Sequence, residues 1–219
     1  MSEKMTYPVV QEFLNELVPA RDPEMQMMEK YAEEHDFPII GPAAGYNCYQ
    51  VARMIRARSV FEMGSGYGYS TAWFARAVQE NCAEEGSDGG VVHHTVWDEK
   101  LSKMAAGHLS RLGYDGLVDY HVAEAVETLR EMPGPFDLIF NDIDKAGYPA
   151  SLPHIKRKLK PGGVLIVDNI LWSGRVFDKT DKSASTEGVR EFTRLITSDP
   201  DWIVSLVPVR DGLILAYKK

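Results

Sequence analysis

"VFEMGSGYGYST", residues 60–71, joins a short apolar run to a segment whose apolar residues have helical spacing. Glycines at 64, 66 and 68 permit positive φ angles and a close approach of a ligand to the backbone. The turn ends on a helix N-terminus, where free N–H groups favour an anionic group. The stretch therefore predicts a strand, a glycine turn and a helix in direct succession.

The same alternation continues along the chain. Apolar runs at 59–63, 91–97, 117–122, 136–142 and 163–169 are separated by segments of helical spacing. This rhythm predicts a parallel sheet covered on both faces. A helix over 186–200 and two strands around "RDG" (210–212) predict a closing hairpin, and residues 7–57 predict helices broken at 20–24 and 37–45.

We therefore expect a doubly wound, Rossmann-like α/β fold with seven mostly parallel strands. Its C-terminal strand is antiparallel, and its N-terminal cap is helical. Residues 1–219 form one domain in this interpretation, with the cap over 1–57 and the core over 58–219.

Composition narrows the class of protein. The net charge of −8 provides no electrostatic footprint for nucleic acid or an anionic membrane, although a local basic patch could coexist with it. Cys48 and Cys82 lack metal-ligand spacing and are expected to be packing residues in a reducing compartment. No signal-peptide core and no run of 18 apolar residues occurs, so we expect a cytoplasmic protein.

The glycine turn departs from the dinucleotide fingerprint, which would need glycine at position 69, where Tyr69 stands. The pattern E-x-G-x-G-x-G suits S-adenosylmethionine (SAM), whose carboxylate can meet backbone N–H groups while an acid meets its ammonium. Glu62 is the candidate for that acid, or for a contact that shapes the turn. The alternative is a tight turn that binds no ligand, with a structural Glu62.

Two predicted strands end in acids. Asp142 closes the fourth and Asp168–Asn169 closes the fifth, 26 residues later (168 − 142). Neighbouring parallel strands lie about 4.8 Å apart, so these side chains can meet at the carboxyl edge of the sheet, where open α/β sheets bind ligands. Two carboxylates and an amide oxygen suit Mg²⁺. Each acid alone could instead be a helix cap or a turn residue.

Lys145 follows Asp142 by three residues. A partly desolvated lysine beside a divalent cation loses its proton more easily than one in water, which would let it act as a general base. The alternative is a solvated loop lysine. Asp144 either orients Lys145 or caps the next turn, and Asn141 is expected to find a local hydrogen bond.

Four stretches, "FEMGSGYGYST", "FDLIFNDIDKAGYP", "LKPGGVLIVDNILWSGRV" and "VRDGLILAYKK", resemble the cation-dependent O-methyltransferases of the catechol and caffeoyl-CoA type, which use SAM. The resemblance runs from about Phe37 to the end and implies the class I SAM-methyltransferase fold. It implies that Asp142, Asp168 and Asn169 bind a divalent cation, with Mg²⁺ expected, and that Lys145 and Asp142 are catalytic. The cofactor-binding residues expected on this basis are Glu62, Gly64, Ser65, Gly66, Ser70, Asp98, Glu124, Ala125 and Asp142.

One position departs from the family pattern. The acidic residue for the SAM ribose falls near Val96, and valine cannot accept hydrogen bonds from the ribose hydroxyls. Asp98 takes that role if the strand end is shifted. Otherwise the ribose is held differently, or cofactor binding is weak.

The resemblance implies methyl transfer to one hydroxyl of a vicinal pair on an aromatic small molecule. Trp172 and Tyr148 are aromatic candidates for the pocket rim, and residues 175–188 are expected to form a polar, mobile loop beside it. Two alternatives stay open: methylation of a hydroxylated tRNA nucleoside, helped by a basic strip of Arg157, Lys158 and Lys160, and SAM binding with little catalysis. Members of the family commonly form homodimers, and the N-terminal helices are a plausible contact.

Overall fold

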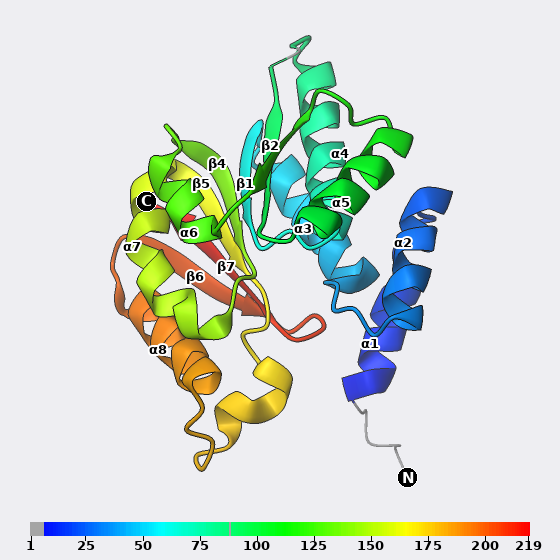
Figure 1. Ribbon diagram of the computed structural model, residues 1–219. Coiled ribbons are helices and arrows are strands. Elements are labelled where there is room, and N and C mark those ends of the chain that lie inside the picture. Colours follow the sequence, from blue (N-terminus) through cyan, green and yellow to red (C-terminus); the bar gives the residue numbers. More distant parts are fainter. Residues whose placement is uncertain (1–6, 88) are drawn as a thin grey trace.

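The computed structural model describes residues 7–87 and 89–219 of the chain (Figure 1). Residues 1–6 of the expected N-terminal cap lie outside the described residues. Seven strands form one sheet in the order β3-β2-β1-β4-β5-β7-β6. They are β1 (Ser59–Met63), β2 (Val91–Val96), β3 (Val118–Val122), β4 (Phe136–Asn141), β5 (Leu159–Val167), β6 (Trp202–Val207) and β7 (Leu213–Lys218).

The sheet confirms the expected topology. The first five strands pair in parallel, and β7 pairs antiparallel with both β5 and β6. The chain runs outward from β1 to β3 and then returns to β4 on the other side of β1. The carboxyl ends of β1 and β4 therefore flank a topological switch point, where α/β sheets bind ligands.

Helices cover both faces of the sheet (Figure 1). One side carries α3 (Gly41–Met54), α4 (Tyr69–Glu84) and α5 (Glu99–Arg111), with α1 (Tyr7–Glu16) and α2 (Pro23–Glu34) outside them. The other side carries α6 (Ala125–Glu131), α7 (Tyr148–Lys158) and α8 (Ala184–Ser198). Two short 3₁₀ helices, η1 (Lys145–Gly147) and η2 (Trp172–Phe177), follow β4 and β5.

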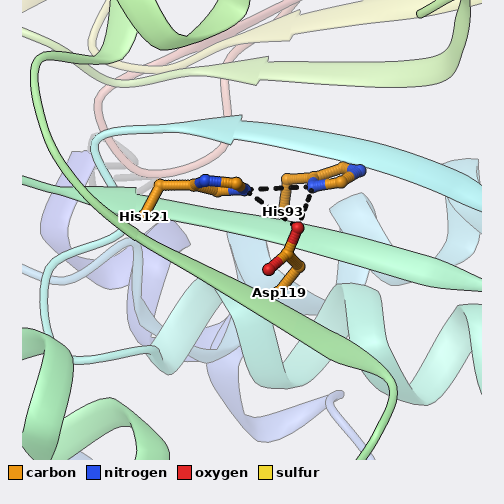
Figure 2. Close-up of side chains that lie close together, drawn as sticks. All are labelled: His93, Asp119 and His121. Carbon is orange, nitrogen blue, oxygen red and sulfur yellow. Dashed lines mark hydrogen bonds and ion pairs between the residues drawn. The ribbon is translucent and has the colours of Figure 1, made fainter. Parts of the chain in front are cut away.

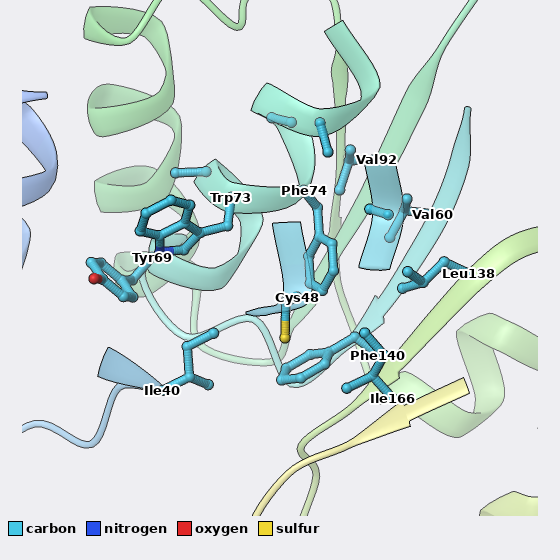
Figure 3. Close-up of a cluster of buried hydrophobic side chains, with 14 of the residues drawn as sticks. Ile40, Cys48, Val60, Tyr69, Trp73, Phe74, Val92, Leu138, Phe140 and Ile166 are labelled. Carbon is cyan, nitrogen blue, oxygen red and sulfur yellow. The ribbon is translucent and has the colours of Figure 1, made fainter. Parts of the chain in front are cut away.

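Each face has its own apolar core. Figure 3 shows part of the core beneath α3 and α4, where Phe74 and Phe140 meet beside Cys48. Both cysteines are buried free thiols, as expected of packing residues. These cores hold the strand ends in place, because burial of apolar side chains is the dominant favourable term in folding.

Two segments differ from expectation. Helix α3 begins at Gly41, inside the 37–45 break, because Pro42 is tolerated in a first turn whose N–H groups lack helical partners anyway. The expected loop at 175–188 is largely ordered by η2 and α8. Asp181 links the two, since its carboxylate accepts hydrogen bonds from Arg175 (2.7 Å) and Thr186 (2.9 Å).

Across residues 7–87 and 89–219, none of the helices has the length and apolar character needed to cross a bilayer.

Candidate active site

Three cavities lie along the carboxyl edge of the sheet, and Asp142 lines all of them. The largest, about 1060 Å³, is also lined by Lys145, Asp168, Asn169 and Trp172. We call it the acceptor cavity. The second, about 420 Å³, lies over the glycine turn, and the third, about 370 Å³, lies over the start of α6. One extended ligand could occupy the second and third cavities and still reach the first at Asp142.

The backbone continues its strand pairing up to the two aspartates. The Asp142 N–H donates to the Met63 carbonyl at 2.9 Å, and the Asp168 N–H donates to the Asn141 carbonyl at 3.1 Å. The Tyr148 hydroxyl adds a hydrogen bond to the Asp168 carbonyl at 3.0 Å. Adjacent strand ends thus place both aspartates at one edge, as the sequence predicts.

Asp168 is 1% exposed, and only one of its two carboxylate oxygens has a hydrogen-bond donor. Its Oδ1 accepts the Asn169 N–H at 2.7 Å, whereas its Oδ2 is buried without a hydrogen-bond donor, and the Arg210 guanidinium stays 3.9 Å away. Burial, followed by repulsion from Asp142, raises the pKa of Asp168 to about 7. Burial also raises the pKa of Asp142. Buried carboxylates in this state gain from a bound cation.

Asn169 supplies a third oxygen beside the two carboxylates. It takes a left-handed backbone conformation (φ 57°), which asparagine tolerates better than most residues. Its side-chain nitrogen donates to Asp211 at 3.2 Å, so the amide oxygen is not used in that bond. Two carboxylates and one amide oxygen form a donor set that fits Mg²⁺.

Lys145 is not a solvated loop residue. It is 8% exposed, and its Nζ lies 2.5 Å from Asp142 Oδ1 and donates to the Ile143 carbonyl at 3.2 Å. Helix α8 packs against it through Gly188, where a Cβ would lie 2.2 Å from the Lys145 carbonyl oxygen. The lysine is therefore held at the wall of the acceptor cavity.

The glycine turn packs directly on the end of β4. Gly64 has φ 87°, and a Cβ there would lie 2.5 Å from the Asp142 carbonyl oxygen. The Gly64 and Ser65 N–H groups donate to the Thr95 carbonyl at 3.2 and 3.0 Å. These two N–H groups shape the turn, and Gly64, Ser65, Gly66 and Ser70 all line the second cavity.

Glu62 lies fully buried beneath the turn, outside the lining of the second cavity. Its Oε2 accepts a hydrogen bond from the Thr71 hydroxyl, and its Oε1 lacks a partner. Burial raises the pKa of Glu62 to about 7, against the opposing effect of the Ser70, Thr71 and Ser65 hydroxyls. The hydrogen bond from Thr71 is the turn-shaping contact that was one of the two roles expected for Glu62.

The remaining expected cofactor residues line the two smaller cavities. Val96 is buried between them, and Asp98 lines the second, where its carboxylate accepts the Lys100 N–H at 2.7 Å and caps α5. Glu124 and Ala125 line the third, and Glu124 caps α6 through the Glu127 N–H at 2.6 Å. Asp98 thus lies two residues beyond the position where the family has its acid, with part of its carboxylate already in use.

Several residues of the site were not found by sequence reasoning. Arg210 and Asp211 line the acceptor cavity because β7 inserts beside β5 and carries the hairpin turn to this edge. The exposed Trp97 lines both smaller cavities. "RDG" predicted a hairpin turn and is part of a stretch that resembles the family, with no role assigned to its residues, and an isolated tryptophan gave no functional signal.

The structure also places the aromatic residues expected at the pocket rim, Asp144 and Asn141. Tyr148 is fully buried and lines none of the three cavities, whereas Trp172 lines the acceptor cavity. Asp144 caps η1 through the Ala146 N–H at 3.1 Å. Asn141 donates to the Ser151 hydroxyl at 3.2 Å, the local hydrogen bond that was expected.

Comparison with solved structures gives close matches of the whole fold. An O-methyltransferase of Streptomyces achromogenes, TomG, involved in tomaymycin synthesis and crystallised with SAM, has a TM-score of 0.83 and 27% identity, with 96% of each chain covered. An O-methyltransferase of Bacillus cereus, crystallised with SAH, has the same TM-score and identity, with 96% of this chain and 97% of that chain covered.

Sequence relatives point the same way. A catechol O-methyltransferase of Niastella koreensis is 27% identical over 221 residues, with 96% of each chain covered. A catechol O-methyltransferase of Mycobacterium tuberculosis is 30% identical over 184 residues, with 83% of this chain and 80% of its own length covered. The model of the O-methyltransferase family matches residues 23–219. With a match over nearly the whole length, the chain belongs to the O-methyltransferase family.

Proposed function

We propose that this protein transfers a methyl group from SAM to a hydroxyl of a vicinal dihydroxy aromatic compound, with a divalent cation, Mg²⁺ first, at Asp142, Asp168 and Asn169. One observation carries the proposal: the buried, donor-free Oδ2 of Asp168 lies at the acceptor cavity, beside a second carboxylate and an amide. The SAM and SAH complexes of the structural relatives and the catechol O-methyltransferase relatives support it.

The two smaller cavities would hold SAM. The glycine turn would hold the methionine part, with Gly66 and Ser70 at its wall, and Glu124 and Ala125 would border the adenine. When bound, SAM supplies an activated methyl group, and the divalent ion supplies Lewis-acid stabilisation of the acceptor oxygen.

The chain's own residues orient the acceptor and move its proton. Trp172 and Ile143 provide apolar surface in the acceptor cavity. Lys145 Nζ, 2.5 Å from Asp142 Oδ1, is within reach of a hydroxyl held beside that carboxylate, and takes its proton as the general base. Holding the hydroxyl in this position replaces a diffusive encounter with a fixed geometry, which is a large part of catalysis by orientation.

A small acceptor is favoured over tRNA because two of the three residues in the expected basic strip are already engaged. Lys160 pairs with Asp137 at 2.5 Å, and Lys158 donates to the Met132 carbonyl. SAM binding with little catalysis is disfavoured because a buried lysine, the buried Asp168 and the partly buried Asp142 at one cavity are costly unless they have a use.

We further propose a homodimer that forms through α1. Val9 and Phe13 are large, exposed apolar residues four positions apart on one face of α1, and the exposed Leu17 directly follows the end of the helix. Light scattering after chromatography tests this: Phe13→Glu should shift the mass from dimer to monomer, and a wild-type monomer would contradict the proposal.

The methylation activity is tested with the purified full chain, radiolabelled SAM and Mg²⁺. A panel of catechols, matched monophenols and hydroxylated tRNA serves as acceptors. Labelled, singly methylated catechols with little label on the monophenols are expected. Label on tRNA alone, or on none of the acceptors despite measurable SAM binding in calorimetry, would overturn the proposed acceptor class or the proposed catalysis, respectively.

A further inference from the structure

A second group of metal-ligand side chains lies away from the acidic edge, on β2 and β3. His93, Asp119 and His121 bring one ligand atom each to a common point (Figure 2). His93 Nδ1 lies 3.1 Å from His121 Nε2 and 3.2 Å from Asp119 Oδ2, and the third side of the triangle, from His121 Nε2 to that oxygen, is 3.3 Å. None of the three residues lines the cavities described above.

The strand register explains why these side chains meet. His93 is opposite Asp119 in the parallel pair, and His121 is two residues further along β3. Residues at this spacing share one face of a sheet. Phe61 and Phe136 pack near the His93 ring, with centroids 5.9 and 5.5 Å away, and restrain its position.

Protons alone cannot satisfy this triangle. Each imidazole nitrogen carries at most one hydrogen, and an ionised carboxylate oxygen carries none. If both nitrogens are protonated, both N–H groups can donate to the Asp119 oxygen, but they then lie side by side and the contact between the two nitrogens is repulsive. If only one is, it can serve one of its two neighbours well, and at least one contact between two lone pairs remains. A cation between the three atoms satisfies all three contacts at once.

The distances match those around a small divalent ion. Zn²⁺ binds imidazole nitrogen at about 2.0–2.1 Å, so tetrahedral ligand atoms lie about 3.4 Å apart. The three separations of 3.1, 3.2 and 3.3 Å lie just below that value. Two imidazoles and one carboxylate also suit a borderline metal such as Zn²⁺ better than Mg²⁺, which prefers oxygen ligands only. The Asp119 side chain is 53% exposed, which gives an ion a route from solvent.

We propose that His93, Asp119 and His121 form a Zn²⁺ site with water in the fourth position, which ties the edge strand β3 to β2. Binding of an ion by the folded chain alone raises stability, so zinc should raise the unfolding temperature. This site is separate from the acidic edge, and it does not rest on the proposed methyl transfer.

The test is a zinc titration of the metal-free full chain in competition with a chromophoric chelator and in excess Mg²⁺. Wild type should bind zinc at least tenfold more tightly than His121→Gln and Asp119→Asn. Both variants spare the more buried His93. His35→Gln, which removes an exposed histidine from the end of α2, is the matched control and should bind like wild type.

Two further readouts separate this site from the acidic edge. Asp142→Asn should keep the zinc, and zinc should raise the thermal midpoint of wild type and of Asp142→Asn but not of His121→Gln. Equal zinc affinity in wild type and His121→Gln would overturn the proposal. Zinc binding lost in Asp142→Asn but kept in His121→Gln would overturn it as well, because the ion would then belong to the acidic edge.

Discussion

Aspartates stand at both edges of the sheet, Asp137 at the amino end of β4 and Asp142 and Asp168 at the carboxyl ends of β4 and β5, and the two edges are built differently. At the amino end, Asp137 accepts the N–H groups of Arg58 (2.7 Å) and Ser59 (2.9 Å) and pairs with Lys160. Burial acts to raise the pKa of Asp137, but these partners outweigh it and hold the pKa below its usual value. At the carboxyl end, Asp168 has an unpartnered oxygen and a raised pKa of about 7. At the amino end the carboxylate is fully paired, whereas at the carboxyl end one carboxylate oxygen has no hydrogen-bond partner.

The largest effect should come from Asp142→Asn. Loss of this ligand should reduce turnover by roughly a thousandfold, because Lewis-acid stabilisation is worth several kcal/mol. The thermal midpoint without metal should change little, since relief of the repulsion between Asp142 and Asp168 opposes the loss of the ion pair between Asp142 and the buried Lys145. Initial rates with SAM, a catechol and Mg²⁺, together with a thermal melt, check both parts. Normal turnover would remove Asp142 from the chemistry.

Lys145→Ala should follow, with a rate loss of roughly 10²–10⁴-fold at neutral pH, the usual contribution of a general base. The loss should shrink at alkaline pH, where hydroxide can replace the amine. Lys160→Ala is the matched control at the amino end, where the lysine pairs with Asp137, and it should keep its rate. A Lys145→Ala protein with a normal rate at neutral pH would leave the lysine with a structural role only.

Asp211→Ala should have a smaller effect, confined to metal affinity. The Asp211 carboxylate accepts a hydrogen bond from the Asn169 side-chain nitrogen at 3.2 Å. Loss of such a partner of a metal ligand typically weakens metal binding by about 10–100-fold. The Mg²⁺ concentration for half-maximal rate should rise, while the rate at saturating Mg²⁺ stays within a few-fold. Asp201, which pairs with Lys156 instead, gives the control Asp201→Ala. Equal Mg²⁺ requirements in both variants would show that Asn169 is oriented without Asp211.

Asp137→Ala should leave turnover per folded molecule unchanged and cost stability instead. Two backbone N–H groups and a lysine lose their acceptor, a loss of about 2–4 kcal/mol in the free energy of unfolding. Urea denaturation at neutral pH measures it. A strong loss of turnover in the folded protein would contradict the division between the two ends of the sheet.

The pH dependence of that loss has a definite sign. Asp137 has a lowered pKa when folded, so the unfolded chain binds more protons, and the stabilisation is complete above the ordinary value of 3.8. It disappears as the pH falls through the lower, folded pKa. The stability gap between wild type and Asp137→Ala should therefore close in acid. A gap that stays constant down to the acid limit would contradict the assigned partners.

Local sequence patterns were enough to predict most of the fold and part of the candidate site. Alternating apolar runs and the turn after Met63 predicted the sheet. Asp142 and Asp168 were predicted to meet because each directly follows a strand, and the register of β4 and β5 places these two strand ends side by side. The partners of these residues depend on long-range packing instead. Asp211, for example, reaches Asn169 only because β7 inserts beside β5. The His93–Asp119–His121 group likewise depends on a register that no local pattern encodes.

We propose that the carboxyl end of the sheet, where Asp168 has an unpartnered oxygen, supports methyl transfer by binding a divalent cation. The most direct test measures methyl transfer to a catechol by metal-free protein as Mg²⁺ is added and then removed with excess EDTA. Turnover should be negligible without metal, rise saturably with Mg²⁺ and be lost on chelation. Undiminished turnover in excess EDTA would contradict it.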